Sequence, residues 1–281
     1  MALLVLKLVL TPLFIGGASI AARRRGPAFG GWLISLPLTS GPVALFLALD
    51  QGPAFGSAAA EASLAGCIAI SAYGLIYART GPRYGWRGAL GAGLAGWLAA
   101  ALAVQPMLHW PVPALFALVA LVIIAAVQLM PARSSAIAAA TWSRWDVPLR
   151  MAVATSVVIG VTAAAPLLGT GPSGLLAMLP MMGTILAVFA HRAGGTSDGI
   201  AVQRGILSGL IGTAAFLAVV AGSIENLGVV ASFGVALVTV ILIQAVILLV
   251  LRAGSTAQAG GLAGRADKPM RPAPVAGGRA R

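Results

Sequence analysis

Two prolines stand five residues apart in one apolar stretch, and the polar residues between them are the best candidates for binding a ligand. The segment contains Pro37, Thr39, Ser40, Gly41 and Pro42. Each proline removes a backbone N–H donor, and its ring clashes with the carbonyl four residues earlier. Because lipid cannot hydrogen-bond the freed groups, they must be buried in protein or line a wet cavity. Thr39 or Ser40 can cap a half-helix starting near Pro42, whose positive end would attract a polar or anionic ligand.

A weaker interruption of the same kind occurs in the second half of the chain. Pro180, Gly183 and Thr184 stand within another apolar stretch, at the position that corresponds to the first interruption. Paired interruptions in corresponding membrane helices are the best sequence pointer to a transporter's substrate site. The alternative is a plain proline kink whose freed carbonyls are satisfied by Ser and Thr, since Pro and Gly are common in membrane helices.

Four charged residues within the apolar stretches complete the candidate site. They are Lys7, Glu61, Arg150 and Arg204. Lys7 and Glu61 can pair across helices, which lowers the cost of burying either charge. For the three basic residues the competing explanation is that their side chains reach the nearby membrane interface. If they do face the interior, cations and helix ends together favour an anionic or strongly polar solute.

The chain lacks the groupings that catalysis or metal binding requires. It has one cysteine, Cys67, and two histidines, His109 and His191, and no acidic residue lies near the middle of an apolar stretch. We therefore expect no metal site, no cofactor and no catalytic residue, and the protein is not predicted to be an enzyme. The missing carboxylate also weakens the case for carboxylate-based proton coupling, which would have to use Glu61 or Asp50.

The composition is that of a protein embedded in lipid. The chain has 281 residues, of which 59% are hydrophobic and 9% charged, and its mean hydropathy is +0.99. A soluble globular protein carries about 25% charged residues, so here lipid must cover most of the surface. The net charge of +12 does not indicate nucleic-acid binding, because the cations lie between apolar stretches and in the C-terminal tail.

Nine apolar stretches are long enough to cross a bilayer, since a spanning helix needs about 20 apolar residues. Lys and Arg residues lie in alternate loops and in the tail, and the intervening loops have none. Because Lys- and Arg-rich loops stay in the cytoplasm, we expect a multi-pass protein of the bacterial inner membrane with its N-terminus outside and its C-terminus inside. The stretches are 2–21, 28–49, 57–78, 87–105, 112–130, 147–168, 172–191, 199–222 and 227–251.

The chain also matches itself without a gap at an offset of 143 residues. The first four stretches match the last four, and the stretch 112–130 has no partner. This extra helix makes the number of helices between equivalent positions odd, so the two halves cross the membrane in opposite directions. Inverted repeats of this kind are typical of secondary transporters, which hold substrate near the midplane. The most informative aligned pairs are Gly26 with Gly169, Pro37 with Pro180, Phe46 with Phe189, and Gly52 with Gly195.

The repeat predicts an all-α integral membrane protein with four regions. Residues 1–106 form the first four-helix repeat, and residues 107–146 form a linking helix and a cytoplasmic connector. Residues 147–252 form the second repeat. Residues 253–281 are a basic tail rich in Gly, Ala, Pro and Arg, which is expected to be disordered.

The run from Gly31-Trp32-Leu33 to Pro42, followed by Asp50-Gln51-Gly52, resembles a family of bacterial multi-pass membrane proteins without an assigned activity. The resemblance covers most of the nine stretches but not the tail, and it implies no catalytic residue. The architecture favours a carrier or exporter of a small polar or anionic metabolite that works by alternating access, although a fold does not fix a function. The alternatives are a non-transporting membrane subunit or assembly factor and, less favoured, a membrane-embedded enzyme acting on a lipid-linked substrate.

Overall fold

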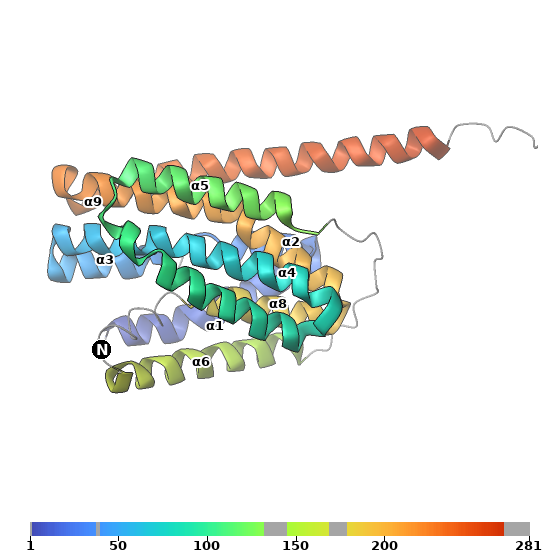
Figure 1. The fold of residues 1–281 in the computed structure, drawn as a ribbon, viewed down its shortest axis with the longest axis horizontal. Helices are drawn as coiled ribbons and strands as arrows, with labels where there is room; N and C mark the ends of the chain where they lie inside the picture. The colour runs from blue at the N-terminus through green and yellow to red at the C-terminus, as the bar shows by residue number, and fades with distance from the viewer. Residues whose placement is uncertain (1, 38–39, 132–144, 169–178, 267–281) are drawn as a thin grey trace, which may run out of the picture. The chain divides into compact units, whose positions relative to one another are not determined.

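The computed structural model describes residues 2–37, 40–131, 145–168 and 179–266 (Figure 1). Within these ranges the chain is α-helical apart from one short 3-10 helix, and they contain no strand. The expectation of an all-α protein is therefore confirmed. The helices are α1 (Ala2–Arg25), α2 (Pro27–Ile34), α3 (Ser40–Gln51), α4 (Pro53–Ala103), the 3-10 helix η1 (Gln105–His109), α5 (Val112–Leu129), α6 (Asp146–Leu168), α8 (Met181–Gly194) and α9 (Thr196–Ala266).

Two of these helices, α4 and α9, are each bent at one glycine into two arms. Gly85 in α4 has φ 63° and ψ −172°, and Gly228 in α9 has φ 77° and ψ 170°. Only glycine adopts this backbone region readily, because it has no Cβ. The sequence predicted a loop between separate stretches at both places, and the structure has a corner of one residue instead.

Three helices are long and apolar enough to span a membrane. They are Pro53–Ala103 in α4, Val112–Leu129 in α5 and Thr196–Ile247 in α9. Large apolar side chains also point outward from them, including Leu121, which is 64% exposed, and Val230, which is 83% exposed. Side chains of this kind suit contact with lipid, which supports the assignment to a membrane.

The chain divides into two units, residues 1–243 and residues 244–281. The second unit contains the last part of α9, which continues to Ala266. This differs from the sequence analysis, which expected disorder from residue 253. Five of the residues from 253 to 266 are alanine, the best helix former, and extending an existing helix requires no new nucleus. All contacts described below lie within the first unit.

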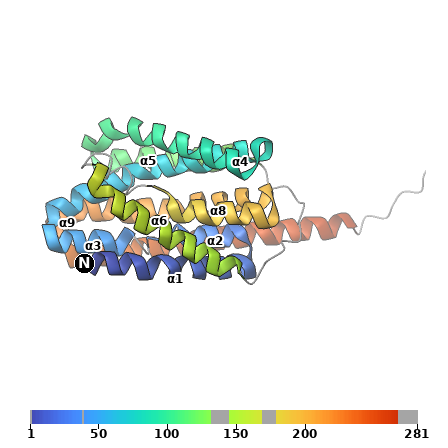
Figure 2. The same cartoon turned by 90° about the horizontal axis from the view of Figure 1, so that it is seen from below.

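Helices α1 and α6 lie side by side and run in opposite directions (Figures 1 and 2). Arg150 Nη1 lies 3.4 Å from the Ser19 hydroxyl. Further along α1, Arg23 reaches Asp146, the first residue of α6. Numbering therefore rises along one helix as it falls along the other.

The first arms of α4 and α9 also pack against each other in opposite directions. Near the start of α4, the Ser57 hydroxyl donates a hydrogen bond of 2.9 Å to the Ala221 carbonyl of α9. Further along α4, Gly74 faces the Gln203 side chain, which lies earlier in α9. These two antiparallel arms form the centre of the bundle.

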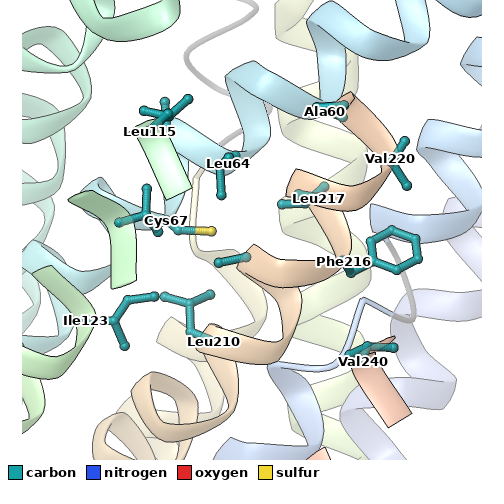
Figure 3. Close-up of a cluster of buried hydrophobic side chains, with 14 of the residues drawn as sticks. Ala60, Leu64, Cys67, Leu115, Ile123, Leu210, Phe216, Leu217, Val220 and Val240 are labelled. Atoms are coloured by element: carbon teal, nitrogen blue, oxygen red, sulfur yellow. The ribbon is translucent and has the colours of Figure 1, made fainter. Parts of the chain in front are cut away.

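The buried core lies where α4, α5 and α9 meet (Figure 3). Leu64 and Cys67 of α4, Leu115 and Ile123 of α5, and Leu210 of α9 are at most 4% exposed. Burial of an aliphatic side chain of this size stabilises a fold by about 1.5–3 kcal/mol in water, and inside lipid the gain comes mainly from close packing. This core fixes the two central arms, which in turn position the residues of the candidate site.

The glycine corners should be sensitive to substitution. We predict that Gly228→Ala lowers the free energy of unfolding by about 1–3 kcal/mol, because alanine is strained at this positive φ. The measurement is thermal or denaturant unfolding of the purified protein in detergent. Gly234→Ala is the matched control, because it lies on the same helix without a positive φ and with no atom within 4 Å of the added methyl group. Equal stabilities of the two variants would contradict the strained corner.

Candidate functional site

The first predicted interruption is present as a break between α2 and α3. Helix α2 ends at Ile34, and α3 begins at Ser40. At the break the Ser35 hydroxyl donates to the Trp32 carbonyl over 2.6 Å. The Thr213 hydroxyl of α9 donates to the Ser35 carbonyl. A backbone group freed by the break is thus bound by a neighbouring helix, as burial away from water requires.

The predicted binding residues of this break are only partly described. Pro37 is buried, and its carbonyl accepts a hydrogen bond of 2.9 Å from the N–H of Gly41. Thr39 lies outside the described residues, and the side chains of Ser40 and Pro42 are not described either. The binding role of these three residues therefore stays a prediction.

The second interruption precedes α8. Pro180 is not helical, and α8 begins at Met181. The N–H of Thr184 donates to the Pro180 carbonyl over 2.9 Å, which closes the first turn of α8. Gly183 is buried against Ile206 of α9, and a Cβ added there would lie 2.8 Å from the Ile206 side chain. Glycine at this position lets the beginning of α8 approach α9 closely.

Beside α8, five polar side chains form a continuous row that the sequence analysis did not identify. The His191 ring near the end of α8 lies between two hydroxyls. Tyr77 Oη of α4 is 3.2 Å from Nδ1, and Thr196 Oγ1 of α9 is 3.0 Å from Nε2. Two turns earlier on α8, the Thr184 hydroxyl faces the hydroxyl of Tyr73. We call Tyr73, Tyr77, Thr184, His191 and Thr196 the polar ladder.

The upper rung of this ladder has unused hydrogen-bonding capacity. Tyr73 Oη and Thr184 Oγ1 are both buried, and neither makes a hydrogen bond of ordinary geometry although they face each other. Gln203 of α9 lies near the same part of α4, with its oxygen beside Gly74, and its Nε2 is also buried without a hydrogen-bond partner. Buried polar atoms normally have a partner, so these atoms are suited to contact a bound solute.

A weak signal for the ladder was present in the sequence. Tyr73 and Tyr77 are four residues apart, and Thr184 and His191 are seven apart, so each pair lies on one face of its helix. Nothing in the sequence indicated that the two faces meet. The histidine had been weighed only as a metal ligand.

Arg150, one of the predicted binding residues, is part of an ion network. It is fully buried, and its Nη2 lies 2.8 Å from Asp146 Oδ2, which also pairs with Arg23 at 3.3 Å. The guanidinium lies 5.2 Å from the centre of the Phe189 ring. Arg150 therefore joins α6 to α1 and α8, and it does not reach toward the interface as the competing explanation required.

Arg204, another predicted binding residue, holds the end of α5. Its guanidinium donates to the carbonyls of Val127, Met130 and Pro131 over 3.4, 3.2 and 2.9 Å. The last carbonyls of a helix have no intrahelical partner, and a cation there also complements the helix dipole. Arg79 of α4 supplies a similar contact at the Leu129 carbonyl.

The remaining charged candidates, Lys7 and Glu61, do not join the ladder in the described structure. Glu61 is partly buried on α4, and the side chain of Lys7 is not described. A Lys7–Glu61 ion pair therefore stays a prediction.

Two cavities of the described bundle are apolar. One, of about 260 Å³, lies next to both helix breaks and is lined by Leu13, Phe14, Leu33, Leu36 and Met182 among others. The other, of about 620 Å³, is an open groove between α5 and α9 whose lining is also apolar. The polar groups of the candidate site thus lie beside these cavities and not inside them.

Comparison of the chain with protein-family models, curated proteins and solved structures finds no match. The resemblance to a multi-pass membrane family therefore stays a prediction, and the function has to be argued from the geometry.

The contacts of Arg204 predict a structural role. We expect Arg204→Met to lower the free energy of unfolding by about 1.5–3 kcal/mol, because a hydrogen bond from a charged donor contributes about that much. Unfolding of the purified protein in detergent measures the change. Arg83→Met removes an exposed arginine from α4 and should change the stability little. A stable Arg204→Met protein that has lost a binding activity would instead return Arg204 to the substrate site.

Proposed function

We propose that this protein is a secondary carrier that moves a small polar or anionic solute across a bacterial inner membrane by alternating access. The observation that carries the proposal is an interrupted helix that recurs at equivalent positions of two halves with opposite directions. In secondary transporters built from inverted repeats, such helices surround the substrate site near the midplane.

Helix boundaries 143 residues apart support the inverted repeat. The same offset that aligns the sequence also aligns the ends of the helices, and those ends were not used to find it. The matching boundaries are the ends of α1 and α6 (Arg25 and Leu168), the ends of α3 and α8 (Gln51 and Gly194), and the starts of α4 and α9 (Pro53 and Thr196).

The backbone conformation of four glycines supports the same offset. Gly52 and Gly195 precede equivalent helices with φ values of 94° and 82°. Gly85 and Gly228 form the two corners with φ values of 63° and 77°. In each pair the second glycine lies 143 residues after the first, so each unusual conformation recurs at its partner's position.

Contacts between the halves are exchanged in the way that a two-fold axis in the membrane plane requires. Gly41 faces Phe216, where a Cβ would lie 3.5 Å from the ring. Moving the first residue forward by 143 and the second back by 143 gives Thr184 and Tyr73, which also face each other. The antiparallel packing of the equivalent first arms of α4 and α9 agrees with this axis.

In the proposed topology the chain crosses the membrane nine times. The two arms of α4 and the two arms of α9 supply four spans, and α1, the α2–α3 pair, α5, α6 and the stretch that ends in α8 supply the other five. The N-terminus lies outside and the basic C-terminal region lies inside, following the positive-inside rule.

The start of α8 supports a polar or anionic solute. Its first N–H groups carry the positive end of the helix dipole, which attracts anions. The buried hydroxyls of Tyr73 and Thr184 lie at the same first turns and have unused hydrogen-bonding capacity. A solute with oxygen acceptors would satisfy both features.

A non-transporting membrane subunit is the second candidate, and the apolar cavities favour it. Both of the cavities described above are lined by apolar side chains. A carrier therefore has to open a polar path at the breaks, whereas a structural subunit does not.

The inverted repeat predicts opposite locations for two equivalent turns. We expect a reporter fused after Gly52 to lie outside the membrane and one fused after Gly195 to lie in the cytoplasm. Alkaline phosphatase and green fluorescent protein fusions, which are active on opposite sides of the inner membrane, measure the location. Reporters on the same side would contradict the inverted repeat.

Alternating access predicts that both breaks can be reached from both sides. Cys67 is the only cysteine in the sequence, so Cys67→Ala gives a clean background. In it we expect Gly41→Cys and Thr184→Cys to react with a membrane-impermeant maleimide in right-side-out and in inside-out vesicles. Leu64→Cys, in the closed core, is the unreactive control. Failure of both break positions to react from either side would favour the non-transporting subunit.

A further inference from the structure

His191 is a buried histidine whose two ring nitrogens both meet hydroxyl groups. The residue is 8% exposed. Its Nδ1 lies 3.2 Å from Tyr77 Oη, and its Nε2 lies 3.0 Å from Thr196 Oγ1. The His191 and Tyr77 rings also meet edge to face, with centroids 6.0 Å apart. The imidazole is therefore held in place from α4 and from α9.

Hydroxyl partners allow this ring to gain a proton without losing a hydrogen bond. A neutral imidazole has one N–H donor and one acceptor nitrogen, whereas the protonated ring has two donors. The hydroxyls of Tyr77 and Thr196 can each donate or accept by rotation about the C–O bond. Both charge states are thus accommodated by the same heavy-atom positions, which neither a carbonyl pair nor an amide pair would permit.

No charged group is among the two hydrogen-bond partners of the ring. The charged residues near it on the elements that pack around it are Arg192, Asp198, Arg79 and Arg83. Arg192 lies over the Trp86 ring, Arg79 binds the Leu129 carbonyl, Arg83 lies over the Tyr84 ring, and the Asp198 carboxylate approaches Gly194. The charge at this position therefore changes chiefly with the protonation of His191 itself.

The ladder connects this ring to the second helix break. Thr196 is partly exposed at the turn between α8 and α9, whereas Tyr77 is buried. Tyr73 stands beside Tyr77 with ring centroids 5.8 Å apart, and its hydroxyl faces Thr184 in the first turns of α8. Protonation of His191 can therefore be felt at the break, two turns away along one rigid helix.

We propose that His191 binds the proton that couples to transport, so that the coupling ion of the carrier is H⁺. This inference rests on the proposed function. A proton from cytoplasmic water enters past Thr196 and binds the free ring nitrogen, and it leaves by the reverse step when the ring becomes neutral. Because a buried cation is costly, protonation favours the conformation in which this end of α8 is hydrated from the cytoplasm.

The test uses labelling of Gly41→Cys in the Cys67→Ala background, because position 41 lies far from His191 in the sequence and on another helix. The rate of maleimide labelling is measured in inside-out and in right-side-out vesicles between pH 5.5 and 8. The ratio of the two rates at one pH cancels the pH dependence of the thiol. We expect acid to raise the ratio of cytoplasmic to outer labelling severalfold, with a midpoint in the range where imidazole titrates.

Two histidine variants decide the outcome. We expect His191→Gln to make the ratio independent of pH, and His109→Gln to leave the pH dependence unchanged. A His191→Gln protein with the pH dependence of the parent would overturn the proton site while leaving the carrier intact. Absence of labelling from both sides in every variant would overturn the carrier itself.

A second measurement keeps the inference open to refutation if His191→Gln does not fold. In the His109→Gln protein, His191 is the single histidine, and its ¹⁵N imidazole resonances report its protonation state directly. We expect one reversible transition between pH 5 and 9, shifted in Tyr77→Phe and in Thr196→Val, because each variant removes one hydroxyl partner. A ring that stays in one charge state throughout this range would overturn the proposal.

Discussion

The structure depends on one constraint, which is that every backbone polar group inside lipid needs a partner within the protein. The break after α2 is tolerated because Thr213 of α9 binds the Ser35 carbonyl. The end of α5 is tolerated because Arg204, also on α9, binds three of its carbonyls. The first arm of α9 thus supplies the partners for irregular backbone on two other helices, and this explains why it lies at the centre of the bundle.

Close approach of the helices makes these contacts possible. Gly31 of α2 and Gly205 of α9 lie against backbone carbonyls of the facing helix, where any larger residue would collide. Small residues at such interfaces are typical of membrane helices, which associate by packing and by hydrogen bonds and gain little from the hydrophobic effect. The polar ladder lies along a similar contact, between α4 and α8, and it is shielded from lipid by the same close packing.

The sequence predicted the features that follow from local chemistry. Prolines break a helix wherever it lies, so the interruptions near Pro37 and Pro180 could be located, and glycines marked the corners. The roles of the charged residues could not be predicted, because they depend on which helices meet. Arg150 and Arg204 read alike in sequence, yet one pairs with Asp146 and the other binds the end of α5. The ladder was missed for the same reason, since its rungs join residues more than one hundred positions apart.

The corners at Gly85 and Gly228 have a mechanical consequence. Each joins two helical arms through a single non-helical residue, so there is no slack segment to absorb displacement of one arm relative to the other. Two dihedral angles are the whole hinge, and neighbouring residues are held by helical hydrogen bonds on both sides. The arms of α4, like those of α9, must therefore tilt as coupled levers, and larger rearrangements are left to the wider gap between α2 and α3.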